Sequence, residues 1–144
     1  MTDINKVTEF FSNDLFVKHC DIKINEAREG YCECEMKISQ FHLNAGGVIQ
    51  GGAIYTLADF TFAVAANCDG KMTVTESASI NYLKAGKGEK LIAKANKISS
   101  GKSTCLYRVE IFDEKNTLIA FMTATGFIKD IPMDFKEDGG KKLW

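Results

Sequence analysis

A single carboxylate lies inside the longest apolar segment of the chain. Between Ile38 and Cys68 the only formally charged residue is Asp59, which is surrounded by alanine, leucine and phenylalanine. An unpaired buried charge costs several kcal/mol or shifts its pKa, so the Asp59 side chain must face a cleft or an interface. A carboxylate in a cleft can exchange protons with a bound molecule. Asp59 is therefore the first candidate for a catalytic residue.

A glycine-rich loop, residues 44–52, comes directly before this segment. Glycines let the backbone approach a ligand closely, and the first amides of a helix have no acceptor within it. We expect the apolar segment to be a helix that begins near Gly51 and is stopped by Asp69 and Gly70. Free amide donors and Asp59 would then belong to one helix.

The elements that must position this helix are predicted from hydrophobic periodicity. Ile4, Val7 and Phe10 have the spacing of a short amphipathic helix within residues 1–13. A hairpin is expected next, with strands at 22–24 and 31–38 and a turn at 25–30. Four more strands are expected at 73–82, 90–99, 103–112 and 117–129.

These elements indicate an α+β protein with an antiparallel sheet. Among the last four strands there is no second helix of comparable length, so parallel crossovers are disfavoured. The long helix is apolar on nearly every side, which one sheet face does not cover, and we expect a second subunit to help. We expect one domain over residues 1–144, with a mobile tail at 134–144.

Composition and charge exclude several classes of function. The 18 basic and 19 acidic residues give a net charge of -1, so nothing favours nucleic acid or an anionic membrane as a partner. The polar N-terminus predicts no secretory signal, and we expect a cytoplasmic protein. Gly51, Thr56 and Asp59 make membrane insertion of the apolar segment costly.

The cysteines are expected to be reduced thiols. There are five, an odd number, and no two of them form a C-x-x-C pair. Cys32 and Cys34 should point to the same face of a strand as Met36, where small hydrophobic side chains belong. A metal role is therefore disfavoured, and we expect no metal ligands.

The loop and helix carry a specific motif. Residues 42–52 read HLNAGGVIQGG, and residues 57–59 read LAD. This string resembles the signature of the PaaI-like branch of hotdog-fold acyl-CoA thioesterases, in which it reads N-x-x-G-x-x-H-G-G followed by L-x-D. The resemblance continues through 73–82 and the turn at 101–102 to 126–127, and so covers nearly the whole domain.

The resemblance implies a hotdog fold, in which a long central helix is wrapped by a curved antiparallel sheet of about five to six strands. It also implies homodimers with active sites at the subunit interface, often paired into homotetramers. Members hydrolyse the thioester of acyl- or arylacyl-coenzyme A to a free acid and coenzyme A. They use no metal and no bound redox cofactor.

Catalytic roles follow from the matching positions. Gly51 would supply the oxyanion-hole amide, and Asp59 would act as general base or nucleophile. Asn44 would orient water or substrate, and Thr75 would assist the carboxylate across the dimer. Gln50 departs from the pattern, because histidine is commoner there; it can donate a hydrogen bond to the thioester carbonyl but cannot exchange a proton near neutral pH.

Further contacts with the substrate are expected from Gly52, His42, Lys84 and Lys102. The two lysines would contact the phosphates of coenzyme A. Thr75 should share one strand face with Thr73 and Ser77. By helical rise Gly51 and Asp59 lie about 12 Å apart. This is too far for both to act on one carbonyl within a subunit, so the partner must supply one of them.

Three other hypotheses stay open at this point. Asp59 could be a structural acid inside a dimer. The chain could be a hotdog hydratase or dehydratase, although those enzymes pair a histidine with an acid, and neither His19 nor His42 stands at a matching position. It could also be a non-catalytic acyl-CoA or fatty-acid binding module, which the glutamine at position 50 favours.

Overall fold

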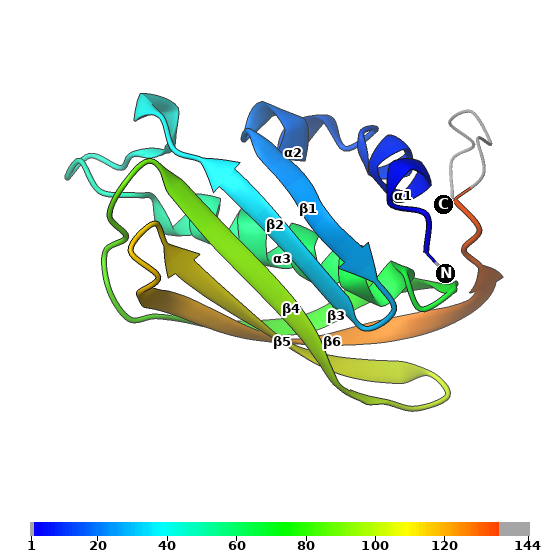
Figure 1. Ribbon diagram of the computed structural model, residues 1–144. Coiled ribbons are helices and arrows are strands. Elements are labelled where there is room, and N and C mark those ends of the chain that lie inside the picture. The colour runs from blue at the N-terminus through cyan, green and yellow to red at the C-terminus, as the bar shows by residue number, and fades with distance from the viewer. Residues whose placement is uncertain (1, 136–144) are drawn as a thin grey trace.

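The computed structural model describes residues 2–135, which form a six-stranded sheet curved around one long helix (Figure 1). The helical elements are α1 (Ile4–Phe11), α2 (Leu15–His19), the 3-10 helix η1 (Gln40–His42) and α3 (Gly51–Asn67). The strands are β1 (Ile22–Arg28), β2 (Tyr31–Lys37), β3 (Lys71–Tyr82), β4 (Lys90–Ser100), β5 (Thr104–Asp113) and β6 (Leu118–Pro132). The predicted α+β hotdog arrangement is confirmed.

The sheet order is β1-β2-β4-β5-β6-β3, and every neighbouring pair is antiparallel. Figure 1 shows α3 running through the hollow of the curved sheet. β3 lies at one edge and is 12 residues long. An edge strand carries a row of unpaired backbone N–H and C=O groups, so β3 is a surface on which a further strand can pair.

The core forms where α3 meets the sheet. Leu57, Phe62 and Val64 are fully buried, and the Phe62 ring packs edge-to-face against Tyr107 of β5 at 5.4 Å between centroids. Five alanines and a leucine favour a helix over this segment, and burial of its apolar side chains against the sheet stabilises it. The helix flank that carries Tyr55 and Asp59 stays only half-buried.

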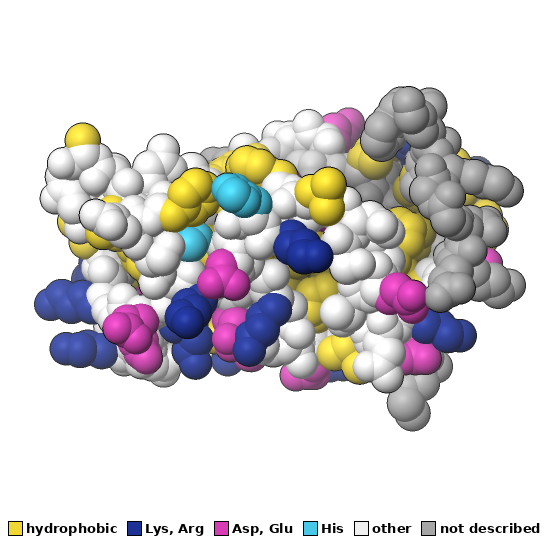
Figure 2. All heavy atoms as spheres, turned by 90° about the horizontal axis from the view of Figure 1, so that it is seen from above, with side chains coloured by type: hydrophobic (Ala, Val, Ile, Leu, Met, Phe, Trp, Pro, Cys, Tyr) yellow, Lys and Arg dark blue, Asp and Glu magenta, His cyan; other side chains and the backbone are white. Residues whose placement is uncertain are grey.

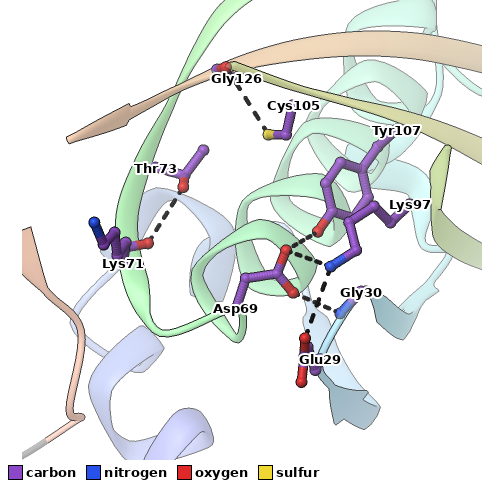
Figure 3. A network of polar contacts seen from close by, with 9 residues as sticks. All are labelled: Glu29, Gly30, Asp69, Lys71, Thr73, Lys97, Cys105, Tyr107 and Gly126. Atoms are coloured by element: carbon purple, nitrogen blue, oxygen red, sulfur yellow. Dashed lines mark hydrogen bonds and ion pairs between the residues drawn. The ribbon is translucent and has the colours of Figure 1, made fainter. Parts of the chain in front are cut away.

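A polar cluster fixes the C-terminal end of α3 to three strands (Figure 3). The Asp69 carboxylate accepts hydrogen bonds from the Gly30 amide at 2.8 Å, from the Lys97 ammonium at 2.9 Å and from the Tyr107 hydroxyl at 2.9 Å. Burial and the neighbouring carboxylate raise the pKa of Tyr107, which keeps this phenol a donor. Because its bonds join the β1–β2 turn, β4 and β5, this cluster serves the fold.

Two local predictions were wrong. β1 continues to Arg28, so the turn consists of Glu29 and Gly30 rather than residues 25–30. β1 has a bulge between Ile24 and Glu26 and continues through polar residues whose sequence resembles a turn. The helix α2 was not predicted; Asp14 begins it by accepting a hydrogen bond from the Val17 amide at 3.0 Å.

All five cysteines are free and buried, as expected. Of the predicted mobile tail, residues 136–144 lie outside the described part of the chain. None of the helices within residues 2–135 combines the length and apolarity that a membrane crossing requires. Figure 2 shows positive and negative side chains interspersed, with exposed hydrophobic groups beside a histidine.

Candidate active site

One row of side chains on α3 runs beside the inner face of β3. Gly51, Tyr55 and Asp59 are spaced by four residues and therefore lie on one flank of the helix. At one end of the row the Thr75 hydroxyl donates to the Asp59 carboxylate at 3.1 Å. At the other end the Tyr82 hydroxyl donates to the Gly51 carbonyl oxygen at 3.0 Å. β3 thus follows the row antiparallel to α3.

A bulge in β3 gives both of these side chains the same direction. Thr75 lies opposite Gly126 of β6, and Ser77 lies opposite Thr125, so β3 has one extra residue at this point. The extra residue reverses the alternation of side chains. Thr75 therefore faces α3 while Ser77 faces outward, and the prediction that these two share a face was wrong.

Asp59 lies in a partly buried position that changes its acidity. Burial raises the pKa of its carboxyl, the hydrogen bond from Thr75 lowers it in part, and the charge of Asp14 raises it further, with a net upward shift. A carboxylate with a raised pKa is a stronger base than an ordinary aspartate. The Thr75 contact with Asp59 is made within one chain, and the expectation that Thr75 assists the carboxylate across a dimer stays a prediction.

The N-terminus of α3 presents hydrogen-bond donors. The Gln50 side-chain oxygen accepts from the Ala53 amide at 3.0 Å and caps the helix. The Asn44 side-chain oxygen accepts from the Gly46 amide at 2.9 Å and from the Val48 amide at 3.2 Å, which shapes the loop. Since both oxygens are engaged, the two NH2 groups are the free ends of these side chains.

The backbone adds two donors to these side chains. Within residues 2–135 neither the Gly51 nor the Gly52 amide donates a hydrogen bond, as expected for the first residues of a helix. The helix dipole adds partial positive charge at the same place. Free donors at a helix N-terminus suit a carbonyl oxygen that becomes negatively charged.

His42 does not contribute to this site. It is buried, its Nε2 donates to the Cys20 carbonyl at 2.7 Å, and its Nδ1 accepts from the Ser39 amide at 3.0 Å. A carbonyl only accepts and an amide N–H only donates, so both ring nitrogens are used by the fold. The expectation that His42 binds substrate is therefore corrected to a structural role.

The two candidate lysines lie far apart in one chain. The Lys84 amide bonds to the carbonyl of Ile119 near the start of β6, whereas Lys102 is next to Ser103, whose carbonyl accepts from Ile128. Nine residues of extended strand separate these points, or about 30 Å. One subunit does not bring both lysines to one ligand, and only Lys84 lies at the Gly51 end.

Sequence reasoning missed Tyr82 and Asp14 as neighbours of the site. Tyr82 is the last residue of β3, and its inward direction depends on the bulge near Glu76, which no sequence pattern marked. Asp14 reaches Asp59 only because α2 folds over α3. Its position before a hydrophobic pair, as a helix N-cap, was the one signal available.

Within one chain the two halves of the site do not meet. Two helical turns, about 12 Å of rise, separate the free amide of Gly51 from Asp59. Tyr55 lies between them, and burial together with Asp59 and Tyr82 raises the pKa of its phenol. Within one subunit the donors and the carboxylate therefore lie too far apart to act on the same carbonyl.

Comparison with known proteins places the chain in a defined group. The family model described as Thioesterase superfamily matches residues 46–120. A protein of Archaeoglobus fulgidus is 38% identical over 134 residues, which cover 92% of this chain and 86% of that protein. The acyl-coenzyme A thioesterase PaaI of Escherichia coli is 32% identical over 76% of this chain and 79% of its own length.

Solved structures show the same likeness. The E. coli PaaI protein superposes with a TM-score of 0.83 at 26% identity, over 89% of this chain and 96% of that one. A hypothetical thioesterase protein of Streptococcus pneumoniae, solved with coenzyme A, has a TM-score of 0.76 at 28% identity, over 83% of this chain and 96% of its own.

Proposed function

Since the chain belongs to the thioesterase superfamily, we propose that it hydrolyses an acyl-coenzyme A thioester to a free acid and coenzyme A. The observation that carries this proposal is the pairing of Asp59 with the Thr75 hydroxyl on the same exposed edge as the donor-rich start of α3. The likeness to a thioesterase solved with coenzyme A supports the choice of thioester.

The complete site is proposed to form between two copies of the chain through β3. Antiparallel pairing of two β3 edges would bring the Thr75 end of one copy against the Tyr82 end of the other. When the bulge residue is not counted, Thr75 and Tyr82 are each three ladder positions from Ser79. The two-fold axis is therefore expected at Ser79, with Asp59 of one copy beside Gly51 of the other.

The proposed chemistry uses these groups in order. The Gly51 amide and the Gln50 NH2 group donate to the thioester oxygen, which stabilises the negative charge that develops there. Asp59 either takes a proton from the attacking water or attacks the carbonyl carbon itself. Collapse of the tetrahedral intermediate breaks the carbon–sulfur bond, and the leaving sulfur takes the proton held by Asp59 or one from water, which gives coenzyme A as the thiol. If Asp59 itself has attacked, water then hydrolyses the acyl–Asp59 anhydride to the free acid. The Asn44 NH2 group holds substrate or water beside the same oxygen.

The acyl group is proposed to lie along the apolar wall near Tyr55 and Phe60, which suits a phenylacetyl-like or medium- to long-chain group. Neither a metal ion nor a redox cofactor has a step in this reaction. Pairing of dimers into tetramers, a cytoplasmic location and contacts of Gly52 and Lys84 with coenzyme A stay predictions.

Thiol release tests the proposed function directly. A panel of phenylacetyl-, hydroxybenzoyl-, short-chain and long-chain acyl-CoA is incubated with the protein, and free thiol is followed with a thiol-reactive dye. Turnover of at least one thioester is expected, and the panel ranks the acyl groups. Saturable binding with no thiol release from any substrate would contradict hydrolysis and favour a binding module.

Between acid and neutral pH, the kcat/KM for acyl-CoA hydrolysis should depend on one ionisation, that of Asp59. Asp59 works as a carboxylate, and its pKa is raised above the ordinary aspartate value, so kcat/KM should fall as the pH drops through that raised pKa. Gln50 does not titrate, so position 50 should add no second limb near neutrality. A second ionisation between pH 6 and 8 would contradict these assignments.

The proposed register of the dimer predicts a specific cross-link. Opposed residues in an antiparallel pair have Cα atoms about 5 Å apart, which suits a disulfide. Ser79→Cys should therefore form a covalent dimer on mild oxidation, seen by non-reducing electrophoresis. Thr123→Cys is the matched control, because Thr123 is exposed and lies opposite Ser79 in β6.

Across the proposed axis two Thr123 residues are three strand spacings apart, or about 14 Å. The control variant should therefore stay monomeric under denaturing, non-reducing conditions. Equal cross-linking of both variants, or none by Ser79→Cys, would contradict the register.

A further inference from the structure

Tyr82 touches the start of α3 at the residue that provides the proposed oxyanion amide. Its hydroxyl donates to the Gly51 carbonyl oxygen at 3.0 Å. Its ring lies alongside as well, because a Cβ built on Gly51 would meet the ring carbon Cζ at 3.4 Å and the hydroxyl oxygen at 3.5 Å. No other described side chain bonds to the backbone of Gly51.

The first turn of α3 needs such a contact. Gly51 and Gly52 are consecutive glycines, and glycine restricts its own backbone less than any other residue. The Gln50 side chain fixes the turn at Ala53, by the cap at 3.0 Å. Tyr82 fixes it at the Gly51 carbonyl. These two contacts hold the direction of the free amides from both sides.

The same hydrogen bond acts on a neighbouring donor. The Gly51 carbonyl and the Gly52 N–H belong to one peptide group, and a hydrogen bond to the carbonyl polarises the N–H. The Gly52 amide has no acceptor within residues 2–135. The Gly52 N–H is therefore a strengthened donor, and it lies next to the Gly51 amide at the start of the helix.

The position of Tyr82 depends on the bulge of β3. Without the extra residue near Glu76, the alternation set by Thr75 would turn the Tyr82 side chain to the outer face of the sheet. One irregularity therefore directs Thr75 to Asp59 and Tyr82 to Gly51. The Asp59 carboxylate and the Gly51 carbonyl oxygen each accept from a hydroxyl of the same strand.

We propose that Tyr82 is a positioning residue of the thioesterase site, which holds the Gly51–Gly52 peptide so that the Gly52 amide, beside the Gly51 amide, meets the developing oxyanion. The inference rests on the proposed function and adds to it a residue that acts through the backbone. Its effect should appear in the transition state, when the oxygen carries charge, more than in substrate binding.

Tyr82→Phe tests this role, because it removes only the hydroxyl of a side chain that is 51% exposed. The kcat for acyl-CoA hydrolysis should fall about tenfold with KM changed less than about twofold. Tyr31→Phe is the matched control; Tyr31 lies on β2 under the Arg28 guanidinium, at the other end of the sheet. Unchanged kcat in Tyr82→Phe, or an effect on KM alone, would overturn the role.

A second readout does not depend on activity. In amide NMR spectra the Gly52 proton resonance should move upfield in Tyr82→Phe, since the peptide loses its polarising hydrogen bond, and should stay in place in Tyr31→Phe. An unchanged Gly52 resonance would overturn the inference even in an inactive protein. If the parent hydrolyses acyl-CoA and Tyr82→Phe has the same kcat, the role of Tyr82 is overturned and the proposed hydrolysis stands.

Discussion

Asp59→Asn should lower kcat/KM by about 10³-fold, because it removes the proton acceptor or nucleophile and keeps the shape of the side chain. The asparagine oxygen can still accept the hydrogen bond that Thr75 gives to Asp59 at 3.1 Å, so the site should stay assembled. Thiol release from the best thioester of the panel is the measurement. Asp130→Asn is the matched control, since that carboxylate is on the surface and pairs with Lys71.

The same substitution should stabilise the fold at neutral pH. The folded-state pKa of Asp59 is raised, mainly by burial, so ionised Asp59 destabilises the folded state above that pKa. As the pH falls through the folded pKa, the folded chain takes up a proton and the parent gains stability. Asparagine has no such charge to desolvate.

Thermal unfolding of parent and Asp59→Asn at a series of pH values shows this difference. The variant should have the higher midpoint at pH 7, and the gap should close as the pH falls from the folded pKa of Asp59 to its unfolded value. A variant that keeps parental turnover would contradict the catalytic assignment of this carboxylate, and a variant less stable than the parent at pH 7 would contradict its raised pKa.

Gly51→Pro should lower kcat by about 10²- to 10³-fold, because it deletes a single amide donor from the oxyanion site. Proline is well tolerated at the first helical position, and the Gly51 amide has no bond to lose within the described chain. The preceding Gln50 has φ -66° and ψ 134°, the extended conformation that a residue before proline prefers.

Gly51→Ala is the control for Gly51→Pro, because it adds a Cβ and keeps the N–H. That Cβ would lie 3.4 Å from the Tyr82 ring, an ordinary contact. If Gly51→Ala and Gly51→Pro lose similar turnover, the loss comes from crowding at Tyr82. That result would contradict the role of the Gly51 amide as a donor.

Much of the fold could be predicted from the sequence because its signals are local. The long apolar run before Asp69 predicted α3 to within a residue or two, and the turns between strands predicted four of the six strands closely. The carboxylate was evident for the same reason, since Asp59 is the single charge in an apolar run. The wrong turn at 25–30 came from polar residues on an outer strand that is bulged.

The contacts around the site could not be predicted, because they depend on tertiary geometry. The bulge that directs Thr75 and Tyr82 inward adds one residue to β3 without a sequence mark. The engagement of His42 with Cys20 likewise joins groups that folded loops bring together. The cap by Gln50 is local, because it reaches Ala53 only three residues along the chain. The motif predicted the candidate residues, and the fold decides in which direction each amide points.

A mixed dimer tests the two-subunit site most directly. Asp59→Asn and Gly51→Pro chains are co-expressed with different affinity tags, and dimers that carry both tags are purified. Such a dimer contains one site with an intact Gly51 amide and an intact Asp59, and one site that lacks both. Turnover per dimer of about half the parental value is expected. Turnover as low as that of either variant alone would contradict a site shared between two chains.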